Sequence, residues 1–94
     1  MNARTVRRHM NRARRILASR MFMAEMNAAL VDSIHSLNHL STAAWELGLD
    51  DELTAVLDEC RRRVASNAEI LATKFMPVNT VALLDAADRA VLAA

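Results

Sequence analysis

The chain has 94 residues and a formal net charge of +1, and this length is that of one small domain. It contains one glycine and one proline, and aromatic residues make up only 3% of it, whereas β-rich folds need turn glycines and aromatic or β-branched strands. Glycine-rich phosphate-binding loops are excluded as well. Alanine, leucine, methionine, arginine and glutamate are abundant and favour helices, so we expect an all-α fold.

The expected architecture is a small bundle of about three to four helices: an N-terminal basic amphipathic helix, a long helical hairpin and a short C-terminal helix. Hydrophobic residues make up 53% of the chain, which is more apolar surface than so small a domain easily buries. We therefore expect self-association, in the simplest case a homodimer, to complete the bundle.

Gly48 and Pro77 are the strong helix breakers, and they divide the chain. Residues 3–47 can all be helical, and Gly48 is expected to end that segment because glycine accepts the left-handed backbone of a helix C-cap. Asp50 is expected to cap a second long helix that ends shortly before Pro77. A short last helix is expected over residues 81–92.

The apolar face changes direction within the first of these segments. Apolar residues spaced three and four apart form one stripe in the first 20 residues, with arginines on the opposite side. After residue 21 the apolar stripe lies on nearly the opposite side of the helix. Two explanations are open: the helix breaks near Ser19 and Arg20, or its first part packs on another subunit. The chain is accordingly divided into an Arg-rich amphipathic arm, residues 1–20, and a helical body, residues 21–94.

Charge is strongly separated along the chain. The first 20 residues hold seven arginines and no carboxylate, whereas the rest of the chain holds five basic and all eleven acidic residues. A guanidinium group pairs with carboxylate or phosphate through two parallel hydrogen bonds, so the arm is expected to bind an anionic partner. The expected partner-binding residues are Arg4, Arg7, Arg8, Arg12, Arg14 and Arg15.

The leading hypothesis for function is a small non-enzymatic interaction protein, an inhibitor, adaptor or regulator, whose arginines bind an acidic protein surface. The alternative is binding of nucleic acid or nucleotide phosphate by the same basic face. The arm has no aromatic residue for base stacking, and the chain has no helix-turn-helix signature. Attachment of the amphipathic arm to a membrane surface is a third, less favoured interpretation, and a metalloenzyme is the fourth. A solvated face, or ion pairing with the chain's own acidic body, would give the arginines no binding role.

Asp32, His35 and His39 form the one pattern with metal-ligand spacing, because they share a helix face. This face lies opposite the apolar stripe of the body, so we expect a solvated polar surface, no metal and no cofactor. The same acidic face could instead receive the arm of a neighbouring subunit. Cys60 lies in the apolar stripe of the second long helix and is expected to be a buried hydrophobic residue, and no catalytic residue is expected.

Methionines gather where the arm meets the body, and methionine suits irregular or adaptable contacts. The expected oligomer or core seam consists of Met10, Leu17, Met21, Met23, Met26 and Trp45. Trp45 is expected to anchor the corner before Gly48 rather than to bind a ligand. Arg63, Asn67 and Lys74 border the apolar stripe of the second long helix, where we expect a polar boundary beside the seam.

The chain holds a single cysteine, so no internal disulfide can form, and this favours a reducing compartment. No apolar run approaches the roughly 20 residues that a membrane span needs. Arginine greatly outnumbers lysine, and alanine is frequent, as in proteins from GC-rich genomes. We therefore expect a cytoplasmic protein of a bacterium or of a phage-infected host cell.

Overall fold

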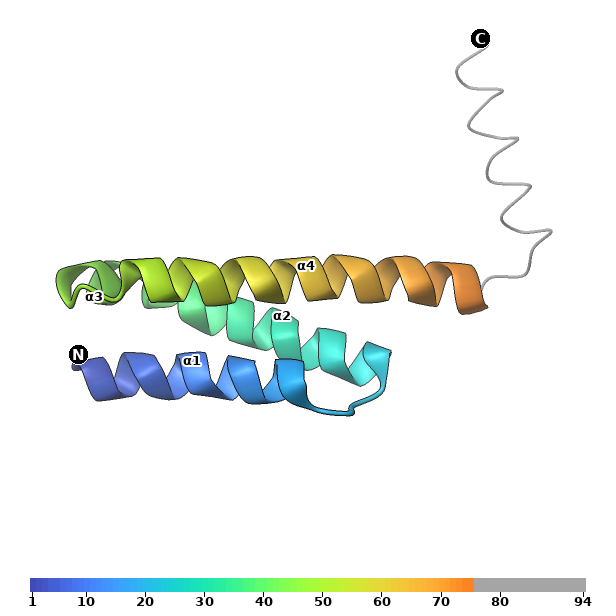
Figure 1. Cartoon of the computed structure of the whole chain (residues 1–94), viewed down its shortest axis with the longest axis horizontal. Coiled ribbons are helices and arrows are strands. Elements are labelled where there is room, and N and C mark those ends of the chain that lie inside the picture. Colours follow the sequence, from blue (N-terminus) through green and yellow to red (C-terminus); the bar gives the residue numbers. More distant parts are fainter. Residues whose placement is uncertain (76–94) are drawn as a thin grey trace, which may run out of the picture.

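The computed structural model describes residues 1–75, and no strand occurs among them. They form four α-helices (Figure 1): α1 Ala3–Ala18, α2 Met23–His39, α3 Ser41–Glu46 and α4 Asp50–Phe75. The prediction of a small all-α bundle is confirmed. The short helix predicted for residues 81–92 lies outside the described residues. Among residues 1–75, no helix has both the length and the apolar character that crossing a membrane requires.

Helix α1 begins and ends at polar side chains that satisfy backbone groups. Asn2 caps its first turn, because the side-chain Oδ1 accepts a hydrogen bond from the backbone N–H of Thr5 at 2.9 Å. At the other end, the hydroxyl of Ser19 donates to the carbonyl of Ile16 at 2.7 Å, and Ser19 has extended backbone angles. The helix therefore breaks where the first of the two sequence-based explanations placed the break.

After this break α2 folds back along α1, and α4 packs against both helices (Figure 1). The buried stripe of α1 belongs to the same hydrophobic cluster as the buried residues of α2 and α4. Val6 and Met10 from α1, Leu30 and Leu37 from α2, and Cys60 from α4 are its largest fully buried side chains. Burial of such a side chain stabilises the fold by roughly 1.5–3 kcal/mol. The apolar stripe of the arm thus packs on the chain's own body.

The corner between α2 and α4 differs from the single long helix that the sequence predicted. Helix α2 ends at His39, and the short α3 follows after Leu40. The hydroxyl of Ser41 donates to the carbonyl of Asn38 at 2.8 Å, which gives that carbonyl a partner at the end of α2. Leu40, at the break, is 5% exposed. The prediction of one continuous helix up to residue 47 is therefore wrong.

Gly48 ends this corner as predicted, with a φ of 71° in the left-handed region. The backbone N–H of Leu49 then donates to the carbonyl of Ala44 at 2.8 Å and closes the turn. Asp50 was predicted to be the capping residue that precedes the helix, but it is the first residue of α4. The first turn of α4 also holds Asp51 and Glu52. Three carboxylates there interact favourably with the positive end of the helix dipole.

Candidate functional site

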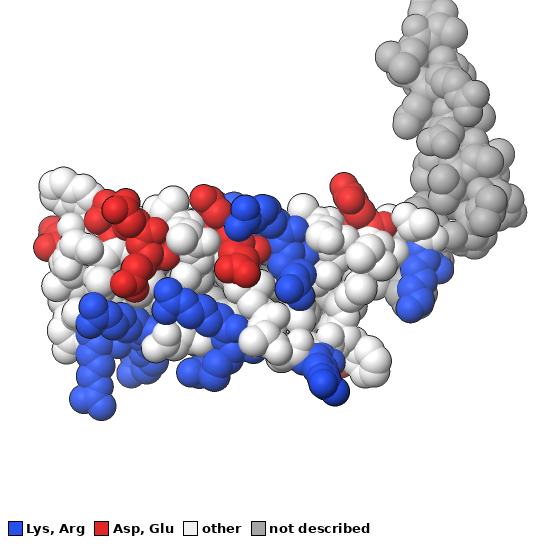
Figure 2. All heavy atoms as spheres, viewed as in Figure 1, with Lys and Arg blue, Asp and Glu red and all other residues white. Residues whose placement is uncertain are grey.

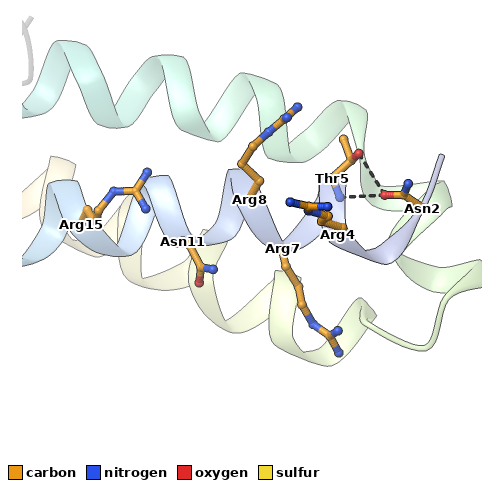
Figure 3. A pocket seen from close by; sticks show the side chains of 7 residues that line it. All are labelled: Asn2, Arg4, Thr5, Arg7, Arg8, Asn11 and Arg15. Carbon is orange, nitrogen blue, oxygen red and sulfur yellow. Dashed lines mark hydrogen bonds between the residues drawn. The ribbon is translucent and has the colours of Figure 1, made fainter.

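Helix α1 presents a face of exposed arginines on the side away from its buried stripe. This arginine face consists of Arg4, Arg7, Arg8, Arg12, Arg14 and Arg15, all of which are exposed. In Figure 3, Arg8 points toward the side where α2 lies and Arg7 toward α4, with Arg4 and Arg15 between them. The opposite side of α1 is anchored by Val6, Met10, Ala13 and Leu17. The guanidinium groups therefore project from a helix that the core holds in place.

A shallow depression runs along the outer side of α1 between these side chains (Figure 3). Its lining contains no carboxylate and consists of Asn2, Arg4, Thr5, Arg7, Arg8, Asn11 and Arg15. Asn11 was missed by the sequence analysis, although its spacing of seven from Arg4 and four from Arg15 places it on the same helix face. Four guanidinium groups beside amide and hydroxyl groups form a surface that favours anions.

Among residues 1–75, one arginine of this face has a carboxylate partner within 4.0 Å. Arg14 Nη2 lies 4.0 Å from Glu52 Oε2 of α4, and Arg14 Nη1 donates a hydrogen bond to Asn11 Oδ1 at 3.1 Å. Both charged side chains of the pair are about half exposed, and such pairs contribute roughly 0.2–1 kcal/mol. Ion pairing with the chain's own body therefore accounts for Arg14, and the other five arginines of the face have no carboxylate within 4.0 Å among the described residues.

Carboxylates gather next to the arginine face, over the first half of α4. Figure 2 shows them in red above the arginines of α1, which are blue, on one side of the molecule. The exposed carboxylates of α3 and of this part of α4, here called the acidic row, are Glu46, Asp51, Glu52, Asp58 and Glu59. Asp58 is paired with Arg61 on its own helix at 3.7 Å. The acidic row thus lies beside the arginine face, and exposed Arg61 and Arg62 follow it along α4.

The histidine pattern of α2 does not assemble into a group of potential ligands. Asp32, His35 and His39 are all exposed on α2. Nowhere in the described chain do three or more histidine, cysteine, aspartate or glutamate side chains come close enough together to hold a metal ion. Binding of a transition metal needs several such ligands at one point.

Cys60 is fully buried between α4 and the other helices, as the sequence predicted. Burial raises the pKa of its thiol, and the negative charge of Glu59 raises it further. A buried thiol that keeps its proton is a poor nucleophile, because the thiolate is the reactive form.

The residues expected at a seam fall into two groups. Met10, Leu17 and Met26 are buried in the core, whereas Met21 and Met23 are 38% and 36% exposed. An apolar groove lies between the α1–α2 loop and the last turns of α4. It is lined by Met21, Phe22, Met23, Ala24, Leu71 and Lys74. Phe22 begins the apolar stripe that the sequence predicts after residue 21, but it is 80% exposed and does not join the core.

Trp45 does not anchor the corner between α2 and α4, and that prediction is wrong. Its side chain is 71% exposed, whereas Ala44 is fully buried and Leu49 is 6% exposed. Ala44 follows the fully buried Leu37 by seven residues, which is two helical turns, and takes the inward position. The neighbouring Trp45, about 100° further around the helix, therefore points outward.

The polar boundary expected on α4 is partly buried. Asn67 is 4% exposed, and its Nδ2 donates to Asn27 Oδ1 of α2 at 3.0 Å. Arg63 Nη1 lies 3.8 Å from the sulfur of Met26, and Lys74 lines the apolar groove. Asn27 was missed by the sequence analysis, because its amide carries no charge or periodic signal.

Comparison with protein-family models, with curated proteins and with solved structures finds no match for this chain.

Proposed function

We propose that this protein is a non-enzymatic helical interaction protein, an inhibitor, adaptor or regulator, that binds an anionic partner through the arginine face of α1. The observation that carries the proposal is the set of five exposed arginines that have no carboxylate partner among residues 1–75. Their summed field attracts anions more strongly than any single contact would.

The way in which α1 is held supports a binding role. Its inner stripe is buried in the core, with Met10 and Ala13 fully buried, so the outer side chains start from a fixed backbone. A surface that is ordered before binding loses less conformational entropy when a partner arrives. Each guanidinium group can then form two parallel hydrogen bonds with a carboxylate or phosphate group.

An acidic protein surface is the partner that this face fits best. Tight binding of unpaired nucleic acid uses aromatic side chains on which bases stack, and α1 contains none. The depression along α1 is shallow and follows the helix, so it can meet a row of carboxylates on another protein. The phosphate alternative uses the same arginines, and the experiment below includes a nucleic-acid probe to distinguish it.

The test compares two triple variants for binding to poly-L-glutamate, measured by isothermal titration calorimetry. Replacing Arg4, Arg8 and Arg15 by glutamine removes three charges from the face. Replacing Arg20, Arg61 and Arg62 by glutamine removes three exposed arginines elsewhere and is the matched control. We expect the face variant to bind at least about tenfold more weakly than the control, since three exposed ion pairs at about 0.5 kcal/mol each correspond to that factor.

Equal affinities of the two variants would overturn the proposal. A single-stranded oligonucleotide is titrated in parallel. Loss of oligonucleotide binding in the face variant, with no measurable binding of poly-L-glutamate by the unmodified protein, would assign the face to phosphate instead. A partner held by charge must also bind more weakly as the salt concentration rises.

A further inference from the structure

The arginine face and the acidic row are neighbours on one side of the molecule, and this arrangement limits what can cover them. Figure 2 shows the arginines of α1 in blue with red carboxylates above them over the first part of α4, followed by blue side chains further along. Arg14 and Glu52 join the bands at their border. Any partner that covers this side must oppose a basic band with acidic groups and an acidic band with basic groups.

A second copy of the chain has this pattern. In a two-fold dimer the same side of both copies meets around an axis that lies in the contact plane. When the axis runs parallel to α1 and α4 along the border between the bands, each arginine face lies over the acidic row of the other copy. When it runs across the helices, like charges meet, so the charge pattern selects the first orientation.

We propose that a second copy of this chain is the acidic partner of the arginine face, in a two-fold dimer in which α1 of each copy lies over the first half of α4 of the other. This inference rests on the proposed function and names the partner of the same face. Arg7 and Arg14 lie on the α4 side of the face, and Glu52 and Glu59 are exposed on α4. These four side chains are the central contacts, and the half-exposed Arg14–Glu52 pair of each copy lies opposite the same pair of the other copy.

The same rotation brings together apolar groups at the other end of the bundle. The loop between α1 and α2 lies at the same end as the last turns of α4 (Figure 1). The dimer axis therefore brings this loop, which contains the exposed Met21 and Phe22, toward the end of α4 in the other copy, where Ile70 is 42% exposed. Burial of apolar surface adds to affinity and, unlike the ion pairs, is not weakened by salt.

The dimer has a distinctive salt response, because each exposed ion pair contributes only roughly 0.2–1 kcal/mol and is screened. Two-fold symmetry makes every ion pair occur twice, so the summed free energy of the pairs favours the dimer at low salt. Sedimentation velocity of the full chain at about 0.05 M salt is expected to give the mass of a dimer, and at about 1 M salt a larger monomer fraction.

Charge reversal tests which groups meet. Replacing Arg7 and Arg14 by glutamate (R7E/R14E) puts acidic groups opposite the acidic row, and replacing Glu52 and Glu59 by arginine (E52R/E59R) puts basic groups opposite the arginine face. Each variant alone is expected to be monomeric. In an equimolar mixture both halves of the contact again join opposite charges, so the two variants are expected to form a heterodimer.

Circular dichroism first establishes that both variants keep their helical content, which is expected because all four positions are exposed. A monomeric unmodified protein at low salt, or a mixture that stays monomeric, would overturn the inference. The proposed function is judged separately: E52R/E59R keeps the arginine face and is expected to retain binding to poly-L-glutamate. If it does so while the unmodified protein is monomeric, the dimer fails and the anion-binding face stands.

Discussion

Asn67 of α4 and Asn27 of α2 hydrogen-bond to each other across the contact between these helices, with 3.0 Å between Asn67 Nδ2 and Asn27 Oδ1. Asn27 Nδ2 in turn donates to the backbone carbonyl of Val64 at 3.2 Å. Among the described residues, Asn67 and Ser33 are the polar side chains that count as buried. The amide pair therefore joins α2 and α4 near the end of the shared core.

Removal of one amide from this pair is expected to be costly. Asn67→Ala leaves Asn27 Oδ1 without the donor that the structure gives it, and loss of such a buried partner costs about 1–3 kcal/mol. Urea unfolding followed by circular dichroism measures the change. Asn38→Ala, which removes an exposed acceptor of Arg61, is the control and is expected to cost less than about 0.5 kcal/mol. Equal losses in the two variants would contradict the role given to the buried pair.

The docking of α1 is tested by Met10→Ala. Met10 is fully buried, and truncation of a buried methionine costs about 2–5 kcal/mol. Met21→Ala is the matched control, because that side chain is 38% exposed and its truncation is expected to cost less than about 1 kcal/mol. If Met10→Ala had as little effect on the free energy of unfolding as Met21→Ala, α1 would not share the core of the body.

Cys60 makes stability depend on pH in the alkaline range. Burial raises the pKa of the folded thiol above its ordinary value of 9.0, so the folded state keeps a proton that the unfolded state loses. The resulting stability is fully present below that ordinary value and is lost as the pH rises through the raised pKa. Urea unfolding at about pH 8 and about pH 10 is expected to show this loss in the unmodified protein and a smaller one in Cys60→Ala. The same loss in both proteins would exclude the thiol as its source.

Gly48 is required for its backbone angle and not for space. Its φ is 71°, and a Cβ placed there would meet no atom within 4 Å. Gly48→Ala is therefore expected to cost about 1–2 kcal/mol through backbone strain alone. Gly48→Asn is expected to cost less, because asparagine tolerates left-handed angles better than alanine does. Thermal unfolding of both variants gives the comparison, and equal melting temperatures would contradict this account.

Much of the fold could be predicted from the sequence where a repeating signal was present. The stripe through Val6, Met10, Ala13 and Leu17 is regular, and all four are buried. The change of apolar face after residue 21 indicated a break, and Ser19 ends the helix with its own hydroxyl. The left-handed angle of Gly48 could be predicted because glycine adopts such angles without strain and this chain has one glycine.

The features that the sequence left out depend on contacts between distant residues. The break at Leu40 has no glycine or proline to mark it. Beyond the break the large Trp45 is 71% exposed and the small Ala44 is buried, which no propensity scale indicates. The pairing of Asn27 with Asn67 joins residues 40 positions apart. For the candidate site, the six arginines could be identified from the sequence. The acidic row beside them could not, because its position depends on how α4 packs against α1.

The most direct test of the central claim is a nitrogen-15 NMR titration of the full chain with poly-L-glutamate, followed through the Nε–Hε signals of the arginines. The account predicts that the signals of Arg4, Arg8 and Arg15 shift first and furthest, because these side chains project from the outer side of α1. Arg61 and Arg62 of α4 serve as internal references. Shifts that are equal for α1 and α4 would contradict the claim that the arginine face is the binding surface.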